Sequence, residues 1–188
     1  VQRTMQEYGV DAQLMDTAGG PPIVYGEVKG RGDHTLLLYN HYDVQPVDPL
    51  ELWETPPFEP SRRDGKLYAR GVADDKDDIV IRLSAMRAWR ELYGELPFTI
   101  KFVFEGEEEF GSPHFYRWAE AHKDMLKADA CLMEATGIAP DGRPPVTPGV
   151  KGMLNVLGLS CGECRRPFLP LTGAEYKELE EALSWVKP

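Results

Sequence analysis

Residues 98–112 read FTIKFVFEGEEEFGS, a strand-like segment that runs straight into a cluster of acids. Phe98 to Phe104 alternates and is rich in aromatic and β-branched residues, which predicts a β-strand. Glu107, Glu108 and Glu109 follow as adjacent carboxylates, which repel one another and are costly to bury together unless cations compensate. A solvated run of charges is the alternative, but a position between an apolar strand and Gly-Ser-Pro favours a cation site.

Two predicted helices and two further predicted strands flank this segment. Residues 77–93 place apolar side chains at roughly helical intervals and are followed by a glycine, which predicts a helix. The short apolar run at 35–39 predicts a buried strand. Residues 112–125 predict a second helix, with a proline in its first turn, and residues 128–133 predict a third strand. The order strand, helix, strand, helix, strand predicts an α/β layer fold with parallel strands.

Four groups of acidic and histidine residues recur along this pattern. They are His41 with Asp43, Asp74 with Asp75, the three glutamates at 107–109, and Glu134. Each group follows a predicted strand or precedes a predicted helix, and ligands collect at the carboxyl ends of parallel strands. Acids at such places are often only turn or capping residues. Four groups in one chain favour a metal site instead.

The spacing within each group suggests distinct roles. His41 and Asp43 are two residues apart, so both side chains face the same side of an extended segment, and a ligand histidine commonly donates its second ring N–H to such a partner. Asp74 and Asp75 cannot both point into one site from a regular backbone, so one is a ligand and the other supports the turn. Adjacent glutamates allow one to bind metal while its neighbour acts as a general base.

Composition bounds the class of protein. The chain has 188 residues, of which 42% are hydrophobic and 28% charged, and these values suit a globular domain with a sizeable core. Its net charge of −10 argues against a nucleic-acid-binding surface. The sequence contains no apolar run long enough for a membrane span and no recognisable signal peptide. Its three cysteines do not form a disulfide framework, so a cytoplasmic location is expected.

The regular pattern weakens after Gly152. We therefore expect one domain at residues 1–153 and an atypical tail at residues 154–188, with a helix near 173–187. The Pro-rich segment at 45–66 predicts an ordered loop that wraps the body of the domain.

Three segments, residues 40–46, 70–76 and 105–112, resemble the metal-site motifs of the co-catalytic zinc peptidases. That family includes carnosine-type dipeptidases, carboxypeptidase G, aminoacylase, and the acetylornithine and succinyl-diaminopimelate deacylases. The His-Tyr-Asp-Val-Gln-Pro form of the first segment, with Trp53 and Pro57-Phe58 after it, is most similar to the dipeptidase branch. The resemblance covers roughly residues 5–153. It implies a three-layer-like catalytic domain with a mostly parallel central sheet flanked by helices.

The resemblance also implies roles for single residues. It assigns two zinc ions, or another divalent metal such as cobalt or manganese, to His41, Asp74 as the bridging ligand, Glu109 and Glu134. Glu108 becomes the general base, Asp43 supports the histidine, and Glu107 lies outside the set. The implied reaction is attack of a zinc-bridging hydroxide, activated by Glu108, on the amide carbonyl of a small peptide or an N-acyl amino acid.

The chain departs from the family pattern in two ways. Asp77 stands where the family usually has glycine. The family also inserts a lid domain after the region of Gly149–Gly152, which supplies one histidine, and a later segment supplies the last zinc ligand. This chain has only four histidines, at 34, 41, 114 and 122.

We therefore expect the catalytic-domain portion without its lid, which alone would be weakly active or inactive. The alternative is a non-catalytic relic or metal-binding module that retains the fold. Because such lids usually carry the dimer contact, the sequence leaves open whether the chain forms a homo-oligomer.

Overall fold

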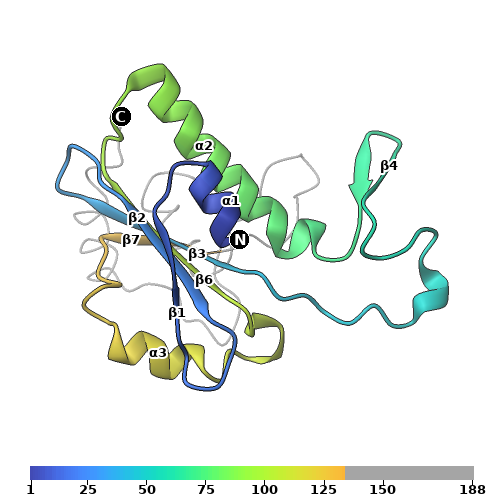
Figure 1. Ribbon diagram of the computed structural model, residues 1–188. Helices are drawn as coiled ribbons and strands as arrows, with labels where there is room; N and C mark the ends of the chain where they lie inside the picture. The colour runs from blue at the N-terminus through green and yellow to red at the C-terminus, as the bar shows by residue number, and fades with distance from the viewer. Residues whose placement is uncertain (134–188) are drawn as a thin grey trace, which may run out of the picture. The chain divides into compact units, whose positions relative to one another are not determined.

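The computed structural model describes residues 1–133, which form a central sheet with helices on both faces (Figure 1). The elements in chain order are α1 (Gln2–Glu7), β1 (Ala12–Met15), β2 (Ile23–Val28), β3 (Thr35–His41), β4 (Ser61–Arg63), β5 (Lys66–Tyr68), α2 (Asp77–Tyr93), β6 (Thr99–Glu105), α3 (Phe115–Ala121) and β7 (Ala130–Leu132). Short 3-10 turns at Leu50–Leu52 and Glu108–Phe110, and a turn at Val72–Lys76, connect them.

The main sheet has five strands in the order β1-β2-β6-β3-β7. The three strands predicted from the sequence, β3, β6 and β7, run parallel to one another, and His41 lies opposite Glu105 in the ladder between β3 and β6. The predicted α/β class is confirmed. The sheet is mixed because β1 and β2, which were not predicted, add antiparallel pairs next to β6. The parallel strands bring their carboxyl ends, and the acids that follow them, to one edge.

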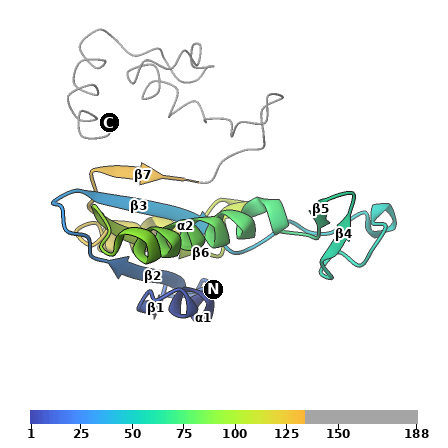
Figure 2. The same cartoon turned by 90° about the horizontal axis from the view of Figure 1, so that it is seen from above.

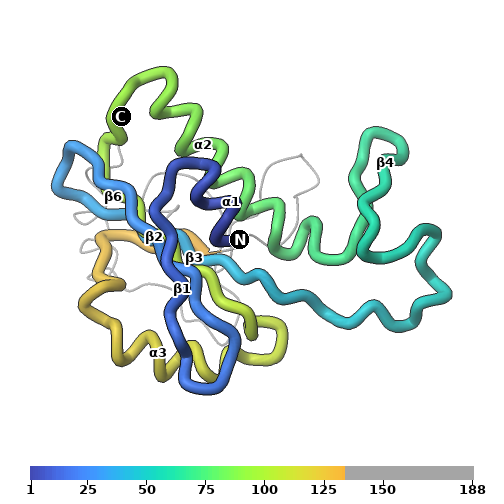
Figure 3. Tube along the Cα trace, in the orientation of Figure 1, coloured from blue at the N-terminus to red at the C-terminus, as the bar shows by residue number. Residues whose placement is uncertain are grey.

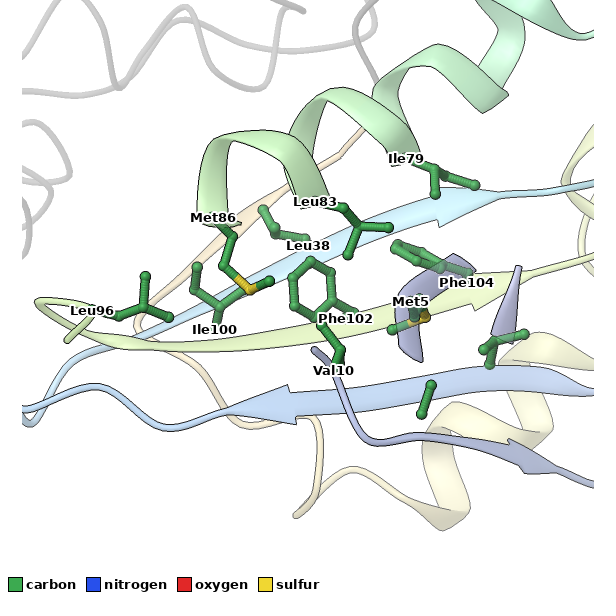
Figure 4. Close-up of a cluster of buried hydrophobic side chains, with 12 residues drawn as sticks. Met5, Val10, Leu38, Ile79, Leu83, Met86, Leu96, Ile100, Phe102 and Phe104 are labelled. Carbon is green, nitrogen blue, oxygen red and sulfur yellow. The ribbon is translucent and has the colours of Figure 1, made fainter. Parts of the chain in front are cut away.

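The larger core lies between the sheet and the helices α1 and α2 (Figure 4). Ile79, Leu83 and Met86 lie on one face of α2 and point onto the strands, where Phe102 and Phe104 are fully buried. Burying a side chain of this size stabilises the fold by about 1.5–3 kcal/mol. The predicted helix at 77–93 is thus confirmed, and it ends at Gly94 as expected.

A second, smaller core lies on the opposite face of the sheet, under α3. Trp118 of α3 packs there with Tyr39 and Val103, which alternate in direction with Leu38 and Phe102 along the same strands. The helix was predicted over 112–125, but it is shorter. It cannot begin at Ser112, because the φ angle of Ser112 is 53° and that of Gly111 is 96°, both in the left-handed region.

The Pro-rich segment between β3 and α2 does not wrap the body as predicted. It leaves the end of β3, extends away from the sheet, turns through the hairpin β4–β5 and returns at the start of α2 (Figures 2 and 3). The indole N–H of Trp53 donates to the carbonyl of Val47 at 2.9 Å, and the guanidinium of Arg63 stacks 4.2 Å from the ring centre of Tyr68. Both contacts join residues within the arm.

Residues 134–188 lie outside the part of the chain that the structure describes. The predicted boundary after residue 153 and the predicted helix near 173–187 therefore stay predictions. Between residues 1 and 133, no helix combines the length and the apolar character needed to cross a bilayer.

Candidate metal centre

His41 is the last residue of β3, and its side chain is fully buried between two carboxylates. Its Nδ1 lies 3.2 Å from Oδ1 of Asp43, and its Nε2 lies 3.0 Å from Oδ1 of Asp74. When Nδ1 carries the proton and donates a hydrogen bond to Asp43, Nε2 is the nitrogen whose lone pair can bind a metal ion. The structure therefore brings His41 and Asp43 into the pairing that their spacing predicted.

Asp74 and Asp75 face in different directions from the turn at Val72–Lys76. Asp75 is 2% exposed, and its Oδ2 accepts hydrogen bonds from Nδ2 of Asn40 at 2.7 Å and from the backbone N–H of His41 at 3.0 Å. Burial raises the pKa of Asp75, although these two hydrogen bonds partly counteract it. Asp74 is exposed to solvent and is turned toward His41. Asp75 thus supports the turn, and Asp74 is the acid that faces the site.

The glutamates after β6 are held against His41 by two residues of the segment that follows β3. Asp43 accepts the backbone N–H groups of Glu108 at 3.3 Å and of Glu109 at 3.0 Å. Gln45 donates its backbone N–H and its side-chain amide to the carboxylate of Glu109, at 3.0 and 2.7 Å. Glu108 places Oε2 3.8 Å from Nε2 of His41. Asp43 therefore connects the histidine with the loop that carries both glutamates.

The charges around Glu108 disfavour its ionised form. Burial is the main cause of its raised pKa, and repulsion from Glu109, Asp43 and Asp74 adds to it, while His41 acts in the opposite direction. A cation that entered this cluster would relieve the repulsion.

Glu105 and Glu107 are buried, and their carboxylates contact residues other than His41. The carboxylate of Glu105 accepts the hydroxyl groups of Tyr39 at 2.5 Å and Ser112 at 2.7 Å. Glu107 lies 2.9 Å from Nδ1 of His114 and accepts its backbone N–H at 3.1 Å. These bonds fix the two ends of the acidic loop, and they are in keeping with a place for Glu107 outside the ligand set.

Sequence reasoning missed three supporting residues: Asn40, Gln45 and His114. Asn40 and Gln45 lie within the motif at 40–46 that carried the resemblance, so the sequence marked their positions. It did not reveal which residues they contact. His114 had no comparable signal, because its partner Glu107 lies seven residues away across a turn.

His41, Asp74 and Glu109 each offer one ligand atom, and these atoms lie within 4.8 Å of one another. Imidazole nitrogen with carboxylate oxygens is a donor set that suits zinc. Asp75, Asp77 and Asp78 satisfy the same distance criterion. Asp75, however, already accepts hydrogen bonds from Asn40 and from the backbone of His41 in β3. Among the described residues, the first cluster is the better fit for a divalent cation, and the predicted ligand Glu134 lies outside them.

Residues 37–186 match the family described as peptidase family M20/M25/M40. The chain belongs to this family. The resemblance to the co-catalytic zinc peptidases that the motifs indicated is thereby confirmed.

Two curated relatives of this M20 chain have dipeptidase names. The Cys-Gly metallodipeptidase dug1 of Schizosaccharomyces pombe is 36% identical over 137 residues, which are 71% of this chain and 29% of the relative. The Beta-Ala-His dipeptidase of Homo sapiens is 34% identical over 139 residues, which are 70% of this chain and 27% of the relative.

Among solved structures, the M20 family metallo-carboxypeptidase Sso-CP2 from Sulfolobus solfataricus is similar, with a TM-score of 0.71 and 40% identity. The likeness covers 76% of this chain and 32% of that structure. The chain thus spans less than a third of the length of each of these three proteins.

Proposed function

We propose that this chain carries the metal site of a dipeptidase-type metallopeptidase, which hydrolyses the amide bond of a small peptide or an N-acyl amino acid. The observation that carries the proposal is the cluster of His41, Asp74 and Glu109, with their ligand atoms within 4.8 Å, beside the carboxylate of Glu108. The dipeptidase names of the relatives favour small peptides as substrates.

In this proposal, two zinc ions would be held by His41, Glu109, Glu134 and Asp74, which would serve as the shared ligand; cobalt and manganese are alternative metals. Bound zinc lowers the pKa of water toward neutrality and polarises a carbonyl group. Of the two acidic clusters among the described residues, the one with His41 is the better fit for a metal, so we expect one ion to bind well and the second to require further ligands.

Glu108 is the proposed general base. Its side chain is 35% exposed, which leaves it accessible to water, and its raised pKa brings it closer to the neutral range in which a base operates best. Asp43 orients His41 through Nδ1 and holds the loop that carries Glu108 through backbone N–H groups. It thereby fixes the base relative to the proposed ligands.

The protein that works in the cell would include more than these residues. The matched residues make up only 29% and 27% of the two curated relatives, and the closing histidine ligand that the resemblance implies has no candidate after residue 122. We therefore propose that the chain alone hydrolyses peptides weakly or not at all. A cytoplasmic location and assembly into a homo-oligomer are further parts of the proposal.

Hydrolysis of Cys-Gly, β-Ala-His and an N-acetyl amino acid by the zinc-loaded chain tests the proposed reaction. We expect weak turnover that Glu108→Gln abolishes, while metal content measured by atomic absorption stays that of the wild type. His41→Ala should lose metal and turnover together. Turnover that survives Glu108→Gln would refute the role of the base, and turnover at ordinary enzymatic rates would refute the proposed incompleteness.

A metal-binding module that retains the fold without catalysis is the second candidate. The departure at Asp77 favours it, because this residue adds a carboxylate where the family usually has glycine. Because the first candidate assigns turnover to Glu108, zinc binding by a chain whose turnover does not change in Glu108→Gln would support this second function.

A further inference from the structure

Arg82 is a nearly buried cation that the proposed reaction does not use. It belongs to α2, and its side chain is 9% exposed. A buried arginine is costly unless its N–H groups are paired. Its contacts therefore indicate what it does in the structure.

The guanidinium of Arg82 joins the ends of two parallel strands. Its Nη1 donates to the carbonyl of Tyr39 and to Oδ1 of Asn40, both at 2.7 Å, at the end of β3. Its Nη2 donates to the carbonyl of Met133 at 2.6 Å, just after β7. The same Nη2 lies 3.1 Å from Oδ2 of Asp78, which orients it from the preceding turn of α2.

These bonds lie at the carboxyl end of the described ladder between β3 and β7. Within the described residues, the last pair of that ladder joins Leu38 to Leu132. Arg82 adds side-chain hydrogen bonds to the residues that follow this pair, Tyr39 and Asn40 on one strand and Met133 on the other. A planar fork with five N–H donors can reach both strands at once, which a lysine cannot do.

A chain of buried hydrogen bonds leads from Arg82 to the candidate metal centre. Asn40 accepts from Arg82 and donates to Asp75 at 2.7 Å. Asp75 in turn accepts the backbone N–H of His41 at 3.0 Å. Asn40 is 0% and Asp75 2% exposed, so the network lies in a low-dielectric interior, where such bonds are strong and their loss is costly.

We propose that Arg82 is a positioning residue for the metal centre. It holds the His41 end of β3 and the Met133 end of β7 at a fixed separation, and through Asn40 and Asp75 it fixes the backbone of His41. This role rests on the proposed metal-binding function. Through its bond to the Met133 carbonyl, Arg82 also positions the residue directly before the proposed ligand Glu134.

The test compares Arg82→Met, Arg82→Lys and the control Arg87→Met in the full 188-residue chain. Arg87 lies on the same helix, and its side chain is 49% exposed. Zinc affinity is measured by competition with a chromophoric chelator, at a temperature where circular dichroism shows each variant folded. We expect Arg82→Met to weaken zinc binding about tenfold, the lower end of the effect of removing a supporting group. Arg82→Lys should restore part of the loss, and Arg87→Met should change nothing.

A second measurement separates this inference from the proposed function. In the zinc-free chain, the amide hydrogen of His41 should exchange faster in Arg82→Met than in the wild type, while that of Leu38 in the middle of β3 is unchanged. If the wild type binds no zinc, the proposed function fails, and faster exchange at His41 would still support the coupling.

Unchanged zinc affinity and unchanged exchange at His41 in folded Arg82→Met would overturn the inference. If Arg82→Met does not fold, Asp78→Asn is tested in its place. This variant keeps the guanidinium and removes the carboxylate that orients it. A weaker zinc affinity in Asp78→Asn supports the role, and wild-type affinity contradicts it.

Discussion

At the scale of single residues, backbone direction decides which acids remain available for metal. Glu105 and Glu107 turn away into hydrogen bonds with Tyr39 and His114, whereas Glu108 and Glu109 lie on the side of His41. The available acids therefore repel one another in the metal-free chain, and this repulsion has a measurable consequence.

Glu108→Gln should stabilise the metal-free chain at pH 7. The pKa of Glu108 is raised in the folded state, so folding is penalised at pH values above that pKa, where the partly buried carboxylate is ionised. Below the ordinary pKa of glutamate the carboxyl group is protonated in both states, and the penalty is absent. The gain should be under about 1 kcal/mol, because solvent screens the partly exposed carboxylate. Differential scanning calorimetry should show a melting temperature raised by less than about 4 °C at pH 7, and no rise near pH 3.5.

The matched control is Glu120→Gln, because the side chain of Glu120 is 78% exposed and lies outside the cluster. It should leave the melting temperature unchanged at both pH values. A lower melting temperature for Glu108→Gln at pH 7 would contradict the repulsion described for this cluster.

Asp43→Asn should weaken zinc binding by about 10–100-fold, the usual cost of removing a group that orients a ligand. An amide at this position cannot accept from His41 and from two backbone N–H groups as the carboxylate does. Asp33→Asn, at an exposed position, is the control. Calorimetric titration with zinc measures both, and equal affinities in the two variants would argue against the role of Asp43.

At the scale of elements, the turn that delivers Asp74 depends on one glycine. Gly71 has a φ angle of 76°, in the left-handed region that side chains other than glycine rarely adopt. A Cβ atom there would lie 2.3 Å from Cγ1 of Val44 and 2.9 Å from Nζ of Lys76. Packing and backbone conformation both require glycine at this position.

Gly71→Ala should therefore destabilise the chain by about 2–4 kcal/mol, as the sum of the left-handed cost and the overlap with Val44. Gly65→Ala is a matched control, because Gly65 has a φ angle of 75° and nothing lies within 4 Å of its Cβ position. It should cost only about 1–2 kcal/mol. Urea unfolding gives both values, and equal losses would show that the contact with Val44 contributes nothing.

The elements differ in how well the sequence predicts them. The helix at 77–93 and the strands around 35–41, 99–105 and 130–132 have local signals, namely apolar periodicity, β-branched residues and a terminal glycine. The strands β1 and β2 were missed because they are stabilised by pairing with each other and with β6, far away in sequence. The left-handed residues before α3 likewise depend on the acidic loop and not on helix propensity.

The site shows the same division between local and distant causes. The sequence predicts that His41, Asp43 and the glutamates meet, because acids after parallel strands share one edge of the sheet. It does not predict which of Asp74 and Asp75 faces the site. That choice depends on Asn40 and the backbone N–H of His41, which both donate hydrogen bonds to Asp75.

At the scale of the whole molecule, the core under α2 fixes the strands that carry the site. Phe102 is 0% exposed in this core. Phe102→Ala should lower the free energy of unfolding by about 3–5 kcal/mol, since it removes buried apolar surface and leaves a cavity. Phe58→Ala, in the exposed arm, should change it by less than about 0.5 kcal/mol. Chemical unfolding compares the two, and a loss below about 1 kcal/mol for Phe102→Ala would contradict this core.

The central claim is that the described part of the chain assembles a zinc site around His41, and the melting temperature with and without zinc tests it most directly. With zinc at about 100 times its dissociation constant, the wild type should gain about 2.7 kcal/mol, which raises the melting temperature by roughly 5–10 °C. A chelator should reverse the rise, and His41→Ala should abolish it. No rise in the wild type, or an equal rise in His41→Ala, would contradict the claim.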